Sequence, residues 1–110
     1  MSYKRTRRWV DALVNDEYEM AAEEHGKVFA SMHEGFSVMQ EELEEAVEEV
    51  TEVGKASHCL WDDVKTDDKD AAVMSAKEVE SYAINVACEA IQVAAMAHKF
   101  RVSFAKDVEE

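Results

Sequence analysis

The residues best suited to chemistry in this chain are oxygen-bearing side chains in two separate segments. The first segment is the run Glu41-Glu42-Leu43-Glu44-Glu45, and the second is an apolar segment that carries Glu89 and Gln92. Glu42 and Glu45 have the spacing of one helical turn, as have Glu89 and Gln92, so each pair would lie on one face of a helix. Oxygen ligands from two facing helices could therefore converge on one hard cation of the Mg²⁺ type.

A simpler interpretation exists for each segment. Acidic runs usually mark a solvated helix face, because glutamate is a good helix former. Glu89 is different, because it lies in an apolar stripe between Val86 and Val93, where an ionised carboxylate is costly unless it meets a cation or a donor. Asn85 and Gln92 flank it at helical spacing. The polar patch is thus either part of a metal site or a hydrogen-bonded network that fixes helix register.

Composition predicts a single all-α domain over residues 1–110. The 110 residues contain no proline and three glycines, which favours long helices over sheet. We expect residues 1–5 and 105–110 to be frayed, so the basic cluster between Lys4 and Arg8 is read as a solvated terminus. The formal charge of −13 argues against nucleic acid and anionic membranes as partners, and a phosphate substrate would need a cation to offset it.

No apolar run approaches a membrane span and the first residues do not form a signal peptide, so we expect a cytoplasmic protein without a membrane partner.

The cysteines and histidines do not have the spacing of known metal or disulfide sites. Cys59 and Cys88 are too few and too far apart for a disulfide framework or a zinc knuckle, and both are expected to be buried small hydrophobes. None of the four histidines has an acid three residues before it, which argues against a di-iron bundle.

Helical periodicity and capping signals place the elements. Apolar residues recur from about residue 6 to residue 24, and His25-Gly26 interrupts them. Ser31 and Glu34 form a capping box that predicts a second helix from Met32 to just before Thr66, with a weak point at Gly54. The segment 65–70 is a connection in which Asp67 or Asp68 could cap the next helix.

The last predicted helix, from Ala71 to about Phe104, is apolar nearly all round. Val86 and Val93 lie on one side of it, and Ile84 and Ile91 on the other. Such a helix is normally buried. We therefore expect a bundle of long antiparallel helices that is completed by oligomerisation, as a homodimer or a homotetramer.

Several of these segments resemble the small MazG-like proteins of phages and prophages, which belong to the all-α nucleoside triphosphate pyrophosphohydrolase superfamily. The resemblance covers about residues 25–50 and 85–100 and leaves the segment 53–77 without a functional interpretation. It rests on His25-Gly26, Ser31, His33-Glu34-Gly35-Phe36, Glu41-Glu42-Leu43-Glu44-Glu45 and Glu89-Ala90-Ile91-Gln92-Val93-Ala94-Ala95-Met96-Ala97.

The resemblance implies Mg²⁺-dependent cleavage of a nucleoside triphosphate to a monophosphate and pyrophosphate, with Mn²⁺ as a possible substitute. Glu42, Glu45 and Glu89 would hold the metal with Gln92, and Glu41 would act in catalysis as an outer-shell group or as the base for a water. Gln92 stands where the family motif has aspartate, and its neutral oxygen can bind a metal but cannot act as a base. The alternative is therefore a catalytically inactive bundle that binds a nucleotide or a protein. Groups to contact the phosphates would come from Lys27, Lys55 or another subunit.

Overall fold

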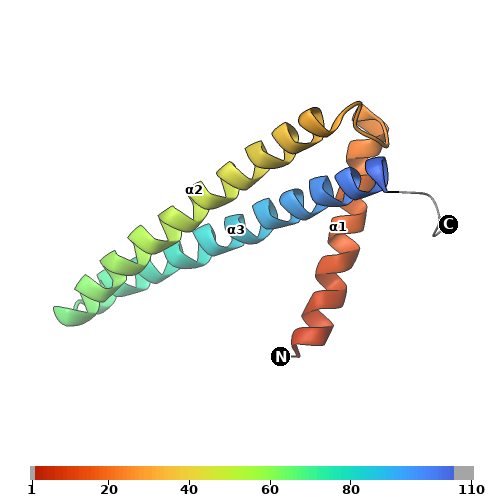
Figure 1. Cartoon of the computed structure of the whole chain (residues 1–110). Coiled ribbons are helices and arrows are strands. Elements are labelled where there is room, and N and C mark those ends of the chain that lie inside the picture. Colours follow the sequence, from red (N-terminus) through yellow and green to blue (C-terminus); the bar gives the residue numbers. More distant parts are fainter. Residues whose placement is uncertain (1, 106–110) are drawn as a thin grey trace. The chain divides into compact units, whose positions relative to one another are not determined.

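The computed structural model describes residues 2–105, and it confirms the predicted all-α fold. Three helices follow one another along the chain, and no strand occurs within the described residues. They are α1 (Tyr3–His25), α2 (Met32–Lys65) and α3 (Lys69–Phe104), as drawn in Figure 1. Residues 1 and 106–110 lie outside the described part, so the prediction that the ends fray stays a prediction there.

The helices are organised as two units, each with its own set of internal contacts. One unit comprises the residues up to Leu43 together with those from Ala90 onwards, so it contains α1, the start of α2 and the end of α3. The other is Glu44–Glu89, a hairpin in which the end of α2 and the start of α3 run antiparallel (Figure 1). Helices α2 and α3 continue through the border without interruption.

Helix α1 starts three residues earlier than the periodicity predicted, because Ser2 provides a cap. The Ser2 hydroxyl accepts a hydrogen bond from the Arg5 backbone N–H at 3.4 Å, which satisfies one of the free donors at the helix start. At the other end the interruption at Gly26 is confirmed. Its φ of 91° suits a residue without a Cβ, and its N–H donates to the Ala22 carbonyl at 2.9 Å.

The capping box at the start of α2 is confirmed, with one change. The Glu34 N–H donates to the Ser31 hydroxyl at 3.1 Å, as predicted. The Glu34 carboxylate, however, accepts from the N–H of Ala30 at 2.7 Å, one residue further back than the ideal partner. Gly54 does not split α2, which runs from Met32 to Lys65.

The turn between α2 and α3 shows which aspartate caps the next helix. The Asp68 carboxylate accepts from the Ala71 N–H at 3.1 Å, so Asp68 is the cap. Asp67 instead has a left-handed backbone with a φ of 56°, a conformation that aspartate tolerates better than most residues. A hydrogen bond of 2.6 Å from the Ser75 hydroxyl to the Asp63 carboxylate joins the two helices beside this turn.

The core of the first unit is small and depends on a close approach of helices. It consists of Tyr18, Phe29, Ala95 and Met96, with partly buried apolar side chains around them. Gly35 is buried against it, and a Cβ there would lie 2.7 Å from a ring carbon of Phe100. Only glycine fits at this point without displacing an aromatic ring.

Many large apolar side chains remain exposed in the single chain. On α3, Val73 and Ile84 are 68 % and 56 % exposed. The helix predicted to be buried on all sides is therefore covered on one side only within one chain, which leaves the predicted oligomer to be tested. No helix in residues 2–105 is both long and apolar enough to cross a membrane.

The prediction that both cysteines are buried is wrong. Cys59 and Cys88 are free and exposed. Cys88 lies on the side of α3 opposite Val86 and Val93, and Cys59 falls beside, not on, the face of α2 that buries Ala56. Their side chains point away from the packed helix faces, although their residue type is among the most often buried.

Candidate metal centre

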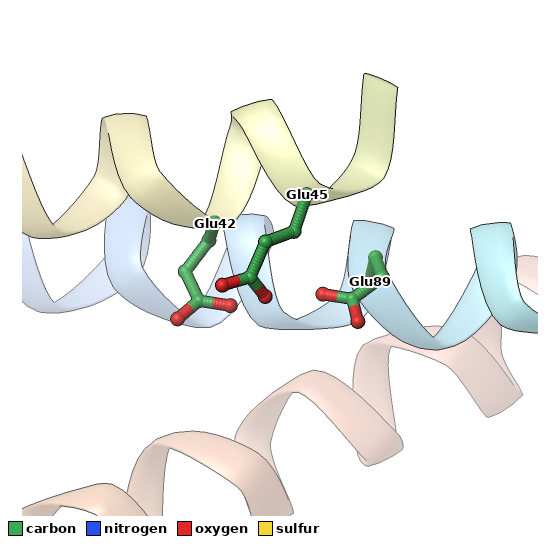
Figure 2. Close-up of side chains that lie close together, drawn as sticks. All are labelled: Glu42, Glu45 and Glu89. Atoms are coloured by element: carbon green, nitrogen blue, oxygen red, sulfur yellow. The ribbon is translucent and has the colours of Figure 1, made fainter. Parts of the chain in front are cut away.

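Three of the predicted ligands come together in the structure. Glu42 and Glu45 occupy successive turns of α2, and Glu89 projects from α3 (Figure 2). One carboxylate oxygen from each residue can be chosen so that no two lie more than 4.8 Å apart. Glu45 and Glu89 belong to the hairpin Glu44–Glu89, and the continuity of α2 places Glu42 one turn before Glu45.

The local packing explains why these carboxylates meet. Ala46, directly after Glu45, is buried, and so is Ala56 further along α2 in the same unit. Small side chains at packed positions allow the helix axes to approach each other, since the interaxial distance depends on the residues at the contact. Glutamates at the border of such a contact have little room to avoid each other. Glu42 and Glu89 are accordingly half-buried, and Glu45 is exposed.

The electrostatics of the cluster are those of crowded negative charge. The pKa of Glu89 is raised above its usual value, first by partial burial and then by repulsion from Glu45. A hydrogen bond with Glu45 and repulsion from Glu49 raise this pKa further. Each cause favours the protonated carboxyl group. Within residues 2–105, neither Glu45 nor Glu89 has an ion pair with a basic side chain that would offset the repulsion.

A cation fits this donor set. Three carboxylate oxygens are hard ligands, and a divalent ion among them would remove the repulsion that raises the pKa of Glu89. Oxygens bound to one Mg²⁺ lie about 4.2 Å apart when they are opposite and about 3.0 Å apart when they are adjacent, since each Mg–O bond is about 2.1 Å long. At most one pair among three bound oxygens is opposite, so rotation of glutamate side chains would have to draw these oxygens closer together than the 4.8 Å limit.

A polar pair borders the cluster in the same unit. The Asn85 amide donates a hydrogen bond of 3.1 Å to the Glu49 carboxylate, and it joins α3 to α2. Asn85 lies one turn before Glu89 on α3, and the charge of Glu49 is one of those that raise the pKa of Glu89. This bond is what the network interpretation predicts, and it also holds Glu49 beside the candidate ligands.

The other predicted site residues are not part of the three-carboxylate group. Glu41 is exposed on α2 and lies outside it. Gln92 is half-buried one turn after Glu89 on α3. Its role as a ligand, in the place where the family motif has an aspartate, stays a prediction. Lys55 is exposed and pairs with Glu52 at 3.4 Å, and Lys27 is exposed.

One buried basic residue, Lys99, was not predicted from the sequence. It is the only buried charged side chain among the described residues, with 4 % of its surface exposed. The signal was present in the sequence: Lys99 follows Ala95 and Met96 by four and three residues, so it lies on the helix face that those core residues define.

Comparison of this chain with models of known families, with curated proteins and with solved structures finds no match. Fold and site are therefore defined by the structure alone as an all-α protein with a carboxylate cluster on two helices. The resemblance to the MazG-like proteins stays a hypothesis that rests on the motifs in the sequence.

Proposed function

We propose that this protein is a MazG-like nucleotide pyrophosphohydrolase, which cleaves a ribo- or deoxyribonucleoside triphosphate to a monophosphate and pyrophosphate. The observation that supports the proposal is the approach of Glu42, Glu45 and Glu89 within 4.8 Å. These are the residues that the two acidic motifs would supply as ligands, and they come from separate helices.

In this proposal Glu42, Glu45 and Glu89 hold Mg²⁺ or Mn²⁺, and Gln92 contributes a neutral carbonyl oxygen. The metal ion supplies charge neutralisation at the phosphates. Glu41 precedes the first ligand and is exposed, so its carboxylate is free to orient a water or to accept its proton. The chain's charge of −13 makes the cation necessary, because without it a triphosphate would be repelled.

We also propose that the working form is a homodimer or a homotetramer. The exposed apolar side chains on α3, such as Val73 and Ile84, support this proposal. Large apolar side chains that stay exposed become an interaction site where they gather into one patch. A second subunit would cover these residues and could contribute basic groups to the phosphates.

A second candidate is a bundle that keeps the fold without the chemistry and binds a nucleotide or a protein. Gln92 favours it, because a glutamine at that position removes one negative charge from the ligand set. The hydrogen bond between Asn85 and Glu49 favours it too, since a polar pair between helices has a structural role without any metal.

The deciding experiment is hydrolysis of a panel of ribo- and deoxyribonucleoside triphosphates with Mg²⁺, with monophosphate and pyrophosphate both quantified. The variants are Glu42→Gln and Glu89→Gln, and the matched control is Glu48→Gln, an exposed glutamate of α2 outside the cluster. Turnover that is lost in both variants and kept in the control supports the enzyme. Inert wild-type protein with both Mg²⁺ and Mn²⁺ would leave the binding module as the better account.

A further inference from the structure

A second feature with the chemistry of a binding site is a pocket in the first unit. Its volume is about 290 Å³, at the lower end of the range typical of small-ligand sites. Apolar groups, including Val38, Phe29 and Met96, form most of its wall. The polar groups that line it are Lys99, Glu34 and His25.

Lys99 is the unusual member of this wall. Its side chain is almost completely buried, and its ammonium nitrogen lies 4.4 Å from the centre of the Phe29 ring. Within residues 2–105 this ring is its partner, and no carboxylate pairs with it and no hydrogen bond uses its Nζ. A cation–π contact compensates only part of the cost of taking an ammonium group out of water.

The backbone around this lysine is held in place by a short chain of hydrogen bonds. The Phe29 N–H donates to the Ser103 hydroxyl at 2.8 Å, and that hydroxyl donates to the Lys99 carbonyl at 2.7 Å. The segment that carries the ring and the helix that carries the ammonium are thus joined through one side chain. Lys99 and Phe29 therefore have a defined mutual position, as expected of a preformed site.

The two other polar side chains of the pocket wall, Glu34 and His25, have partners outside the pocket. The Glu34 carboxylate accepts from the Ala30 N–H as part of the helix cap, and His25, which is exposed, faces Glu24 at 3.5 Å. The ammonium group of Lys99 consequently faces a mostly apolar cavity without a described counter-ion.

We propose that this pocket binds a small organic monoanion, with a carboxylate on Lys99 and an apolar body against Val38, Phe29 and Met96. The ligand carboxylate would accept a charge-assisted hydrogen bond from the buried Lys99 ammonium group, and the apolar body of the ligand would be buried against the pocket wall. A single charge is specified because Glu34 in the pocket wall and the net charge of −13 oppose polyanions. The site is independent of the carboxylate cluster and of the proposed hydrolase activity.

The test uses hexanoate and its neutral analogue hexanamide as probes, in calorimetric titrations of the full chain at about 10 mM ligand, a range suited to weak sites. Wild-type protein should bind hexanoate at least about tenfold more tightly than hexanamide, as a charge-assisted bond predicts. Lys99→Met should remove that preference, and Lys55→Met, the matched exposed lysine, should keep it. Val38→Phe, which reduces the volume and leaves the charge, should weaken hexanoate binding.

Circular dichroism of each variant establishes that it is folded before it is titrated. Equal binding of hexanoate and hexanamide to the wild type would overturn the proposal, as would no detectable binding of either. A preference for hexanoate that survives in Lys99→Met would overturn it as well. If Lys99→Met did not fold, the Val38→Phe titration alone would decide, since unchanged hexanoate affinity in that variant places the anion elsewhere.

Discussion

Replacing Glu89 by glutamine should have opposite effects on stability with and without Mg²⁺. Without a divalent ion, Glu89 is a half-buried carboxylate crowded by Glu45 and Glu49, and its raised pKa reports that crowding. The variant Glu89→Gln removes the charge and nearly preserves the shape, so it should unfold less readily than the wild type. With Mg²⁺, the same charge is a ligand, and the wild type should become the more stable protein.

The size of both effects follows from the geometry. Two unit charges 4.8 Å apart repel by about 0.9 kcal/mol in water, and 0.15 M salt roughly halves this energy. Because Glu45 and, more weakly, Glu49 repel Glu89, the variant should gain about 0.5 to 1 kcal/mol in the free energy of unfolding. An ion that binds only the folded protein adds about 2.7 kcal/mol when its concentration is one hundred times its dissociation constant. The order of stability should therefore reverse.

Urea denaturation followed by circular dichroism measures this reversal in EDTA and in MgCl₂ at matched ionic strength. The control variant is Glu48→Gln, which makes the same charge change on the exposed side of α2. It should respond to Mg²⁺ as the wild type does. The reasoning would be refuted if Mg²⁺ stabilised the wild type and Glu89→Gln to the same extent, because the gain would then come from general screening of the acidic chain.

Three further predictions concern the fold and its pH dependence. Gly35→Ala should destabilise the protein by about 1 to 3 kcal/mol in urea denaturation, since the new methyl group meets the Phe100 ring at 2.7 Å. Gly54→Ala is the control: its methyl group has no atom within 4 Å, and it should stabilise the protein by up to about 1 kcal/mol. Equal effects of the two substitutions would contradict the packing argument. The pKa of Glu89 is higher in the folded than in the unfolded chain, so folding takes up a proton and stability should fall as pH rises from the usual glutamate range through the folded pKa. Denaturation curves over that pH range should show a smaller fall in Glu89→Gln, and an identical profile would count against the assignment. Asp68→Ala should lower the free energy of unfolding by about 1 kcal/mol, because α3 loses its N-terminal cap. The amide hydrogen of Ala71 should then exchange faster with solvent, and an unchanged exchange rate would argue against that cap.

The helices were predictable because their signals are local. The capping box of Ser31 and Glu34 predicted the start of α2, and periodicity predicted the end of α2 and of α3. Helix α3 begins at Lys69, two residues before the predicted Ala71, because Asp68 caps it. The start of α1 was misplaced by three residues because Ser2 caps a turn with little apolar periodicity. Asp67 and Asp68 could not be told apart from the sequence, since either side chain can cap a helix, and the backbone of the turn decided between them.

The candidate site was predictable only in part, for reasons of geometry. Helical spacing predicted that Glu42 and Glu45 share one face of their helix and that Glu89 lies in the apolar stripe of α3, and the structure brings these three carboxylates together. Phase gives no information about the partners across the contact, so the network interpretation predicted a hydrogen bond of this polar patch without identifying Glu49 as the acceptor for Asn85. Cys88 was misjudged because the residue type outweighed its phase, which lies opposite the packed stripe of α3.

Both proposed sites have the same physical origin, an ionisable group that is partly or almost completely buried without an ion pair among the described residues. In one, crowded carboxylates raise the pKa of Glu89 and favour a cation; in the other, Lys99 lies buried against an aromatic ring and favours an anion. If these groups have only a structural role, each one lowers the stability of the free protein, and the variant that lacks the charge should be more stable than the wild type. If they bind an ion, the wild type should become the more stable protein once the matching ion is present. The sign of the ligand effect therefore distinguishes the two accounts, and because the sites require ions of opposite charge, failure at one leaves the other intact.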